Sequence, residues 1–163
     1  MRTTIATILL ATMLPVSIVA QTRSLEDKVN SFIRKAIPTI GVDEVKEWNN
    51  ATILDARKED EYEVSHLPNA IYLGECPHHL DEINQIDKSD TIIVYCTVGY
   101  RSENLGEQLK EQGYTNVFNL FGGIFAWKNA GGTVVDKHNQ PTEKVHTHTE
   151  GWSVFLTKGE KVF

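Results

Sequence analysis

The chain has 163 residues, of which 40% are hydrophobic and 23% charged, so it is long enough for one globular domain with a hydrophobic core. Only 2 cysteines are present, which excludes a disulfide-rich scaffold. The 22 acidic residues outnumber the 16 lysines and arginines. A net charge of −6 without a basic run argues against nucleic acid or an anionic membrane surface as a partner.

Residues 1–20 have the pattern of an export signal. Arg2 is followed by an almost uncharged apolar stretch over 5–19, and cleavage is expected after Ala20. The alternative is a membrane anchor, but the apolar stretch is shorter than a span of about 20 residues and contains Pro15. We therefore expect cleavage, no stable membrane insertion afterwards, and a periplasmic or secreted protein.

Amphipathic spacing predicts a helix over 24–37, within an N-terminal segment 21–37, and a shorter helix over 42–48. Further on, short β-like runs alternate with helical patterns. The runs lie at 39–40, 52–55, 70–73, 91–95 and 116–120, and the helical patterns at 58–64, 78–86, 102–112 and 124–129. The run 91–95 is apolar throughout, as in a strand buried on both faces. This alternation predicts an α/β domain, with a parallel sheet covered by helices on both faces.

Residues 133–163 form a C-terminal extension with a looser pattern. A polar stretch over 136–151 precedes an apolar one that begins at Trp152, with a hairpin turn expected at Lys158-Gly159. Large apolar side chains are costly to expose. The extension is therefore expected either to pack back on the domain, near the rim of the active site, or to meet a protein partner.

The segment that carries chemistry is Cys96-Thr97-Val98-Gly99-Tyr100-Arg101-Ser102, which follows the strongest strand and opens a helix. A loop that curls into a helix N-terminus turns backbone N–H groups inward and favours an anion at its centre. Cys96 is therefore expected to react as a thiolate. Gly99 permits a tight turn, and Arg101 adds a permanent positive charge for an anionic substrate.

A lone cysteine at the end of a buried strand is more often an inert small hydrophobe. Here Gly99, Arg101 and Ser102 follow Cys96 at set offsets between strand and helix. That combination favours a reactive site over the inert alternative.

This loop resembles the active-site loop of the rhodanese family. Three further blocks are similar to family motifs, in chain order Leu54-Asp55-Ala56-Arg57 with Glu61-Tyr62, His66-Leu67-Pro68-Asn69-Ala70, and Leu120-Phe121-Gly122-Gly123-Ile124 with Trp127. Together the blocks cover about residues 38–132, and their combination is specific where each alone is weak. Ser65 and Asn69 replace glycines of the family pattern, and both residues suit turns.

The resemblance implies a rhodanese-like fold of five parallel strands flanked by helices on both faces. It also implies a sulfurtransferase of the thiosulfate sulfurtransferase type. The Cys96 thiolate takes a sulfane sulfur from a small-molecule donor such as thiosulfate, and the resulting persulfide passes it to cyanide or a thiol. The backbone N–H groups of Thr97, Val98, Gly99, Tyr100 and Ser102 are implied to bind the anion, and Arg101 the donor or the leaving sulfite.

Two alternative functions stay open beside sulfur transfer. One is a non-catalytic rhodanese-fold module that senses sulfur or binds a partner, which the extension would suit. The other is a phosphatase or arsenate reductase of the same fold. Phosphatases of this fold carry one residue more between the cysteine and the arginine, so the four residues between Cys96 and Arg101 favour sulfur chemistry.

Asp55 and Arg57 are interpreted as supporting residues, with Asp55 bonded to the loop backbone and Arg57 paired with an acid such as Glu61. Cys76 is either a resolving thiol for Cys96 or a cysteine without a role, and the second reading is favoured. His146 and His148 alternate as metal ligands on a strand would, but no third ligand at clear spacing accompanies them, so no metal is expected. No cofactor is expected either.

Overall fold

The computed structural model describes residues 25–75 and 83–163. The predicted export signal and Cys76 lie outside these residues. Within them, no helix has the length and apolar character needed to cross a membrane.

A five-stranded parallel sheet in the order β1-β5-β4-β2-β3 organises the domain, as expected. Its strands are β1 (Thr39–Ile40), β2 (Thr52–Asp55), β3 (Ile71–Tyr72), β4 (Thr91–Tyr95) and β5 (Asn116–Leu120). The helices between them are α2 (Val42–Glu47), α3 (Glu59–Val64), α4 (Tyr100–Glu111) and α5 (Gly123–Asn129). All five strands end at the same edge, where ligands bind in open α/β sheets.

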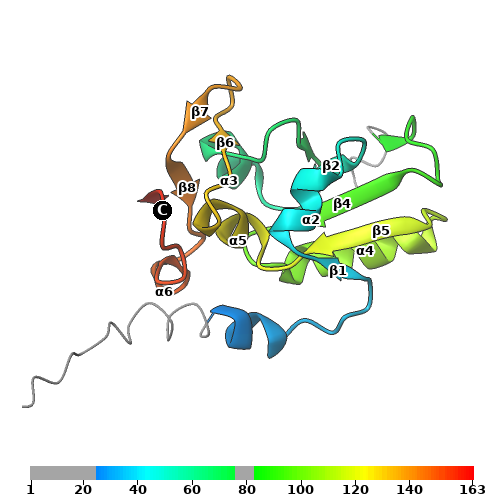
Figure 1. The fold of residues 1–163 in the computed structure, drawn as a ribbon, viewed down its shortest axis with the longest axis horizontal. Helices are drawn as coiled ribbons and strands as arrows, with labels where there is room; N and C mark the ends of the chain where they lie inside the picture. The colour runs from blue at the N-terminus through cyan, green and yellow to red at the C-terminus, as the bar shows by residue number, and fades with distance from the viewer. Residues whose placement is uncertain (1–24, 76–82) are drawn as a thin grey trace, which may run out of the picture.

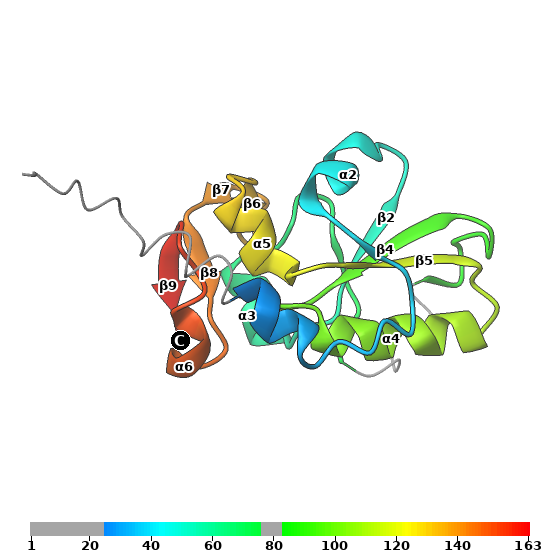
Figure 2. The same cartoon turned by 60° about the horizontal axis from the view of Figure 1, so that its bottom comes forward.

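The central strand β4 is buried on both faces, which explains its unbroken apolar run. Ile93 and Tyr95 pack in the core on the side of α2 and α5, whereas Ile92 and Val94 pack on the side of α4. Figure 2 shows α4 along one face of the sheet and α2 on the other. Because both faces are covered, the alternation of side chains along β4 leads to Cys96 on the α4 side.

The N-terminal helix is shorter than predicted. Within the described residues it covers 25–30 and ends there instead of at Ile37, although the apolar spacing continues to Ile37. The cause is Glu103 of α4, whose buried carboxylate accepts the backbone N–H groups of Arg34 and Ala36 at 2.9 Å each. Those two N–H groups are therefore bound across the fold instead of within a helix.

Two other sequence expectations differ from the structure. Of the helix expected over 78–86, the described residues 83–86 form a tight turn, in which the N–H of Ile86 donates to the carbonyl of Ile83 at 2.9 Å. The hairpin expected at Lys158-Gly159 is wrong, because the strand that follows pairs parallel, not antiparallel, with its neighbour.

The C-terminal extension packs back on the domain. It contains β6 (Val134–Val135), β7 (Pro141–Thr142), β8 (Lys144–His146), α6 (Glu150–Ser153) and β9 (Glu160–Val162). Val145 and Leu156 are buried in the core with α5, and His66 and Val135 exchange two backbone hydrogen bonds. The extension thereby lies at the end of the sheet where α5 begins (Figure 1).

Candidate active site

Cys96 lies where the central strand ends and the loop into α4 begins. Its side chain is only 1% exposed. The sulfur still has a polar partner, because Sγ accepts the backbone N–H of Gly99 at 3.1 Å. It also lies beside the N-terminus of a 12-residue helix, where the helix dipole favours negative charge. A backbone donor and a helix N-terminus therefore both face the sulfur.

A left-handed turn at Gly99 brings its N–H to the sulfur. Gly99 has φ 112°, a backbone conformation that favours glycine, and a Cβ there would also lie 3.0 Å from the flexible Cδ1 of Ile33. Asn119, buried on β5, donates to the Gly99 carbonyl at 2.9 Å and accepts the hydroxyl of Ser102 at 2.7 Å. Both ends of the turn are thus tied to the neighbouring strand.

The start of α5 holds the loop from the other side. The N–H of Ile124 donates to the carbonyl of Cys96 at 2.9 Å, and that of Phe125 to the carbonyl of Thr97 at 3.3 Å. This contact needs Gly123, because a Cβ there would lie 2.2 Å from the Cys96 oxygen. With both carbonyls bonded to α5, their negative ends do not face the sulfur.

Arg101 is bound by two carboxylates. Its Nη1 and Nη2 donate to the two oxygens of Glu61 at 2.6 and 2.8 Å, and Nη1 also donates to Glu75 at 2.7 Å. Nη2 reaches the hydroxyl of Thr97 at 2.7 Å. Glu61 is 1% exposed and Glu75 41%, so the first pair is buried and the second open to solvent.

The charges of this cluster stabilise one another. Burial opposes the charge on Glu61, but the hydrogen bonds and charge of Arg101 outweigh it and lower the pKa of Glu61 to about 2. Burial likewise works against the charge of Arg101, yet Glu61 and the sulfur of Cys96 raise the pKa of the guanidinium. Arg101 is therefore cationic beside the sulfur, although two carboxylates offset its charge.

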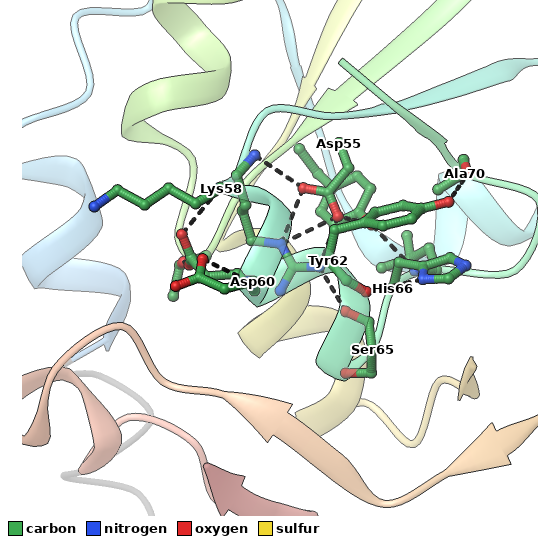
Figure 3. A network of polar contacts seen from close by, with 12 residues as sticks. Asp55, Lys58, Asp60, Tyr62, Ser65, His66 and Ala70 are labelled. Atoms are coloured by element: carbon green, nitrogen blue, oxygen red, sulfur yellow. Dashed lines mark hydrogen bonds and ion pairs between the residues drawn. The ribbon is translucent and has the colours of Figure 1, made fainter. Parts of the chain in front are cut away.

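Asp55 and Arg57 pair with each other, which corrects the two separate roles expected from the sequence. Nη2 of Arg57 donates to Asp55 at 2.6 Å and to the carbonyl of Ser65 at 2.6 Å, with both charged groups fully buried. Asp55 also accepts the hydroxyl of Tyr95. Figure 3 shows this network between the end of β2 and α3, with Tyr62 bonded to the carbonyl of Ala70. Because Arg57 pairs with Asp55, the carboxylate of Glu61 pairs with Arg101 instead.

Comparison with known proteins identifies the family. Residues 41–130 match the model of the rhodanese-like domain. The chain belongs to the rhodanese-like domain family. It is 35% identical over 86 residues to thiosulfate sulfurtransferase GlpE of Coxiella burnetii, a match covering 52% of this chain and 78% of that protein. It is also 34% identical to the tRNA uridine(34) hydroxylase of Legionella pneumophila over 122 residues, covering 60% of this chain and 48% of that protein.

A solved rhodanese-like domain has the same fold as this chain. The solution structure of the rhodanese-like domain of the Alr3790 protein from Anabaena superimposes with a TM-score of 0.56 at 27% identity, covering 61% of this chain and 80% of the other. The residues matched to the family, 41–130, include β2 to β5, the helices between them and the loop after β4.

Beside Cys96 the rhodanese-like domain has a cavity of about 120 Å³. The cavity is lined by Cys96, Thr97, Val98, Tyr100, Arg101, His148 and Trp152. Two predicted loop residues do not line the cavity: Gly99, whose N–H donates to the sulfur, and Ser102, whose fully buried hydroxyl faces Asn119. A role for the backbone N–H of Ser102 stays a prediction.

Sequence reasoning expected the apolar part of the extension, with Trp152, near the rim of the site, and the structure places Trp152 there; it missed His148, Glu75 and Asn119. His148 and Trp152 reach the cavity from the extension, outside the matched residues 41–130. Glu75 and Asn119 contact Arg101 and Gly99 from other parts of the chain. The glycine pair before Ile124 was a usable signal for the contact with α5, and the apolar run from Trp152 was one for the extension, whereas nothing in the spacing of His148 indicates the cavity.

Proposed function

We propose that this chain is a sulfurtransferase, which moves a sulfane sulfur from thiosulfate or a similar donor to cyanide or a small thiol through a persulfide on Cys96. The observation that carries the proposal is the sulfur of Cys96, bonded to the N–H of Gly99 at the carboxyl edge of the sheet and open to a small cavity. The similarity to proteins named thiosulfate sulfurtransferase supports it.

The reaction has two displacements at sulfur. The Cys96 thiolate attacks the outer sulfur of thiosulfate, a new S–S bond forms, and sulfite leaves with the electron pair of the broken bond. The outer sulfur of the persulfide anion is then attacked by cyanide. Thiocyanate leaves, and the electron pair of the cleaved S–S bond returns to Cys96 as thiolate.

The loop stabilises the negative sulfur in both steps. The N–H of Gly99 already donates to Sγ, and inward amides of this kind resemble an oxyanion hole. Arg101 lines the cavity and places a cation beside the sulfur. Because Glu61 fixes its guanidinium and Glu75 offsets its charge, Arg101 orients the donor more than it attracts it from solution.

The decisive experiment measures thiocyanate formation from thiosulfate and cyanide by the purified protein. Cys96→Ala should reduce turnover to the uncatalysed background, whereas Cys76→Ala, which removes the other of the 2 cysteines, should leave it unchanged. Mass spectrometry should find one additional sulfur atom on Cys96 after treatment with donor alone.

Failure of this assay would favour the alternative of a non-catalytic module that senses sulfur or binds a partner. If thiosulfate, mercaptopyruvate and persulfide donors all fail to load Cys96, the protein is not a sulfurtransferase.

Export belongs to the same proposal. Its support is the pattern of residues 1–20, with an apolar stretch after Arg2. Expression of the full chain in a bacterial host should yield a periplasmic protein whose N-terminus, read by mass spectrometry, begins at Gln21. Recovery of the uncleaved chain from the cytosol would contradict export.

A further inference from the structure

Two segments outside the family match meet at the mouth of the Cys96 cavity. Phe32 of the N-terminal segment packs edge-on against Tyr100 and against Trp152, with ring centroids 5.9 Å apart in both pairs. Lys28 lies over the Trp152 ring at 5.9 Å. The active-site helix, the N-terminal segment and the extension therefore form one aromatic cluster beside the cavity.

The extension residues that line the cavity are held in place. Trp152 is half-buried, its backbone N–H donates to Thr149 at 3.1 Å, and its ring packs against Phe155 at 5.6 Å. His148 has φ 63°, and its N–H donates to Nδ1 of His146 at 3.0 Å. The Trp152 side chain is thus fixed by ring contacts, whereas His148 is fixed through its backbone and its side chain is exposed at the cavity.

The cavity lined by His148 and Trp152 is small. The cavity measures about 120 Å³, whereas pockets for drug-sized ligands have roughly 300–1,000 Å³. Because the Cys96 side chain is only 1% exposed, a reagent must enter this cavity to reach the sulfur. The side chains of His148 and Trp152 thus limit what can approach it.

We infer that His148 and Trp152 are specificity-determining residues, which admit small donors and acceptors such as thiosulfate and cyanide to Cys96 and exclude bulky thiols such as a tripeptide. As a statement about substrates, this inference rests on the proposed sulfurtransferase function. The restricted access itself depends only on the geometry, so it can be tested without sulfur transfer.

The test compares the alkylation of Cys96 by iodoacetamide and by the larger iodoacetanilide, which share one reacting group. Cys76→Ser serves as the background, so that Cys96 is the only thiol left. The ratio of the two rates within each variant cancels changes in the reactivity of the thiolate. The variants are Trp152→Ala and His148→Ala.

Trp152→Ala should raise the rate with iodoacetanilide relative to iodoacetamide by about tenfold, a typical effect of pocket size on discrimination. His148→Ala should shift the ratio in the same direction. Two matched controls should leave it unchanged: Trp48→Ala, whose ring packs against Phe118, and His138→Ala in the extension. Circular dichroism checks that each variant is folded.

Unchanged ratios in both variants would overturn the inference. If Trp152→Ala does not fold, His148→Ala decides by the same measurement. Turnover with cyanide and with glutathione then tests the consequence for substrates, and Trp152→Ala should increase kcat/KM for glutathione more than for cyanide. A shifted alkylation ratio without any sulfur transfer would reject the proposed function and leave the restricted access standing.

Discussion

At the scale of single residues, the charge balance around Arg101 is the main feature of the site. An arginine at this position looks like a binding group for an anion, yet both of its terminal nitrogens are bonded to carboxylates. The buried partner, Glu61, fixes the side chain, and the exposed partner, Glu75, competes with any anionic ligand. These two acids should therefore affect the protein in different ways.

Replacing Glu61 should affect stability and its dependence on acid. The pKa of Glu61 is lowered to about 2, so its charged form stabilises the fold at pH above its ordinary value of 4.5, and this contribution is lost as the pH falls from 4.5 through 2. Glu61→Gln should cost about 2 kcal/mol at neutral pH, as for lost hydrogen bonds between charged groups. It should also flatten the acid-induced loss of stability over that range.

Urea unfolding of both proteins at pH 7 and pH 3 measures the effect. Glu59→Gln, an exposed acid on the same helix, is the control and should be neutral. An equal loss of stability in both variants, or the same acid dependence as the original protein, would contradict the role of the buried pair.

Glu75→Gln should act on donor binding. The carboxylate is 41% exposed, so the loss of its ion pair with Arg101 should change stability by less than about 1 kcal/mol. With one negative charge removed from the cavity mouth, the KM for thiosulfate should fall severalfold at low salt and less at high salt. Steady-state kinetics at two ionic strengths test this, and an increased KM would mean that Glu75 positions Arg101 instead of competing for it.

At the scale of elements, the contact between α5 and the Cys96 loop gives a sharp prediction. Gly123→Ala places a Cβ 2.2 Å from the Cys96 oxygen, so the loop or the helix must shift. Gly113→Ala is a matched control, because Gly113 also has a positive φ, 95°, with nothing within 4 Å of the added Cβ.

The control should cost about 1–2 kcal/mol, the strain of a left-handed backbone alone. Gly123→Ala should cost more in thermal unfolding and should also abolish persulfide loading on Cys96. Equal stability and equal loading in the two variants would show that the close approach to Cys96 is unimportant.

The elements with local signals were predictable from the sequence. The apolar run 91–95 predicted β4, because a strand buried on both faces is apolar at successive positions. The periodic pattern of 102–112 predicted most of α4, because a helix buried on one face repeats its apolar residues every three or four positions. The loop after Cys96 followed from its place between them.

Elements that depend on distant contacts were not predictable. The helix at 25–30 ends early because Glu103, about 70 positions away, takes the N–H groups of Arg34 and Ala36. The pairing of β8 with β9 is parallel across an intervening helix, which no turn signal indicates. Packing of the extension near the rim of the site was expected from its apolar residues, but the contribution of His148 to the cavity was not, because it depends on the extension folding back over the domain.

At the scale of the whole molecule, the extension belongs to the core that supports the active site. Lys128 of α5 pairs with Glu143 at 2.9 Å, and Asn129 bonds to the backbone of Phe155 and Thr157. The helix that holds the Cys96 loop at its start is therefore held by the extension at its end. Loss of the extension should weaken the domain and open the cavity together.

Leu156→Ala tests this coupling. Leu156 is 2% exposed within the core that includes α5, so its truncation should cost about 2–5 kcal/mol of unfolding free energy. Phe163→Ala, at a side chain 66% exposed, should stay within about 0.5 kcal/mol. Because one core holds extension and domain, Leu156→Ala should lower the midpoint of a single unfolding transition and, well below that midpoint, speed the alkylation of Cys96. Two separate transitions, or an unchanged alkylation rate, would show that the extension is a separate unit whose packing does not control access to the sulfur.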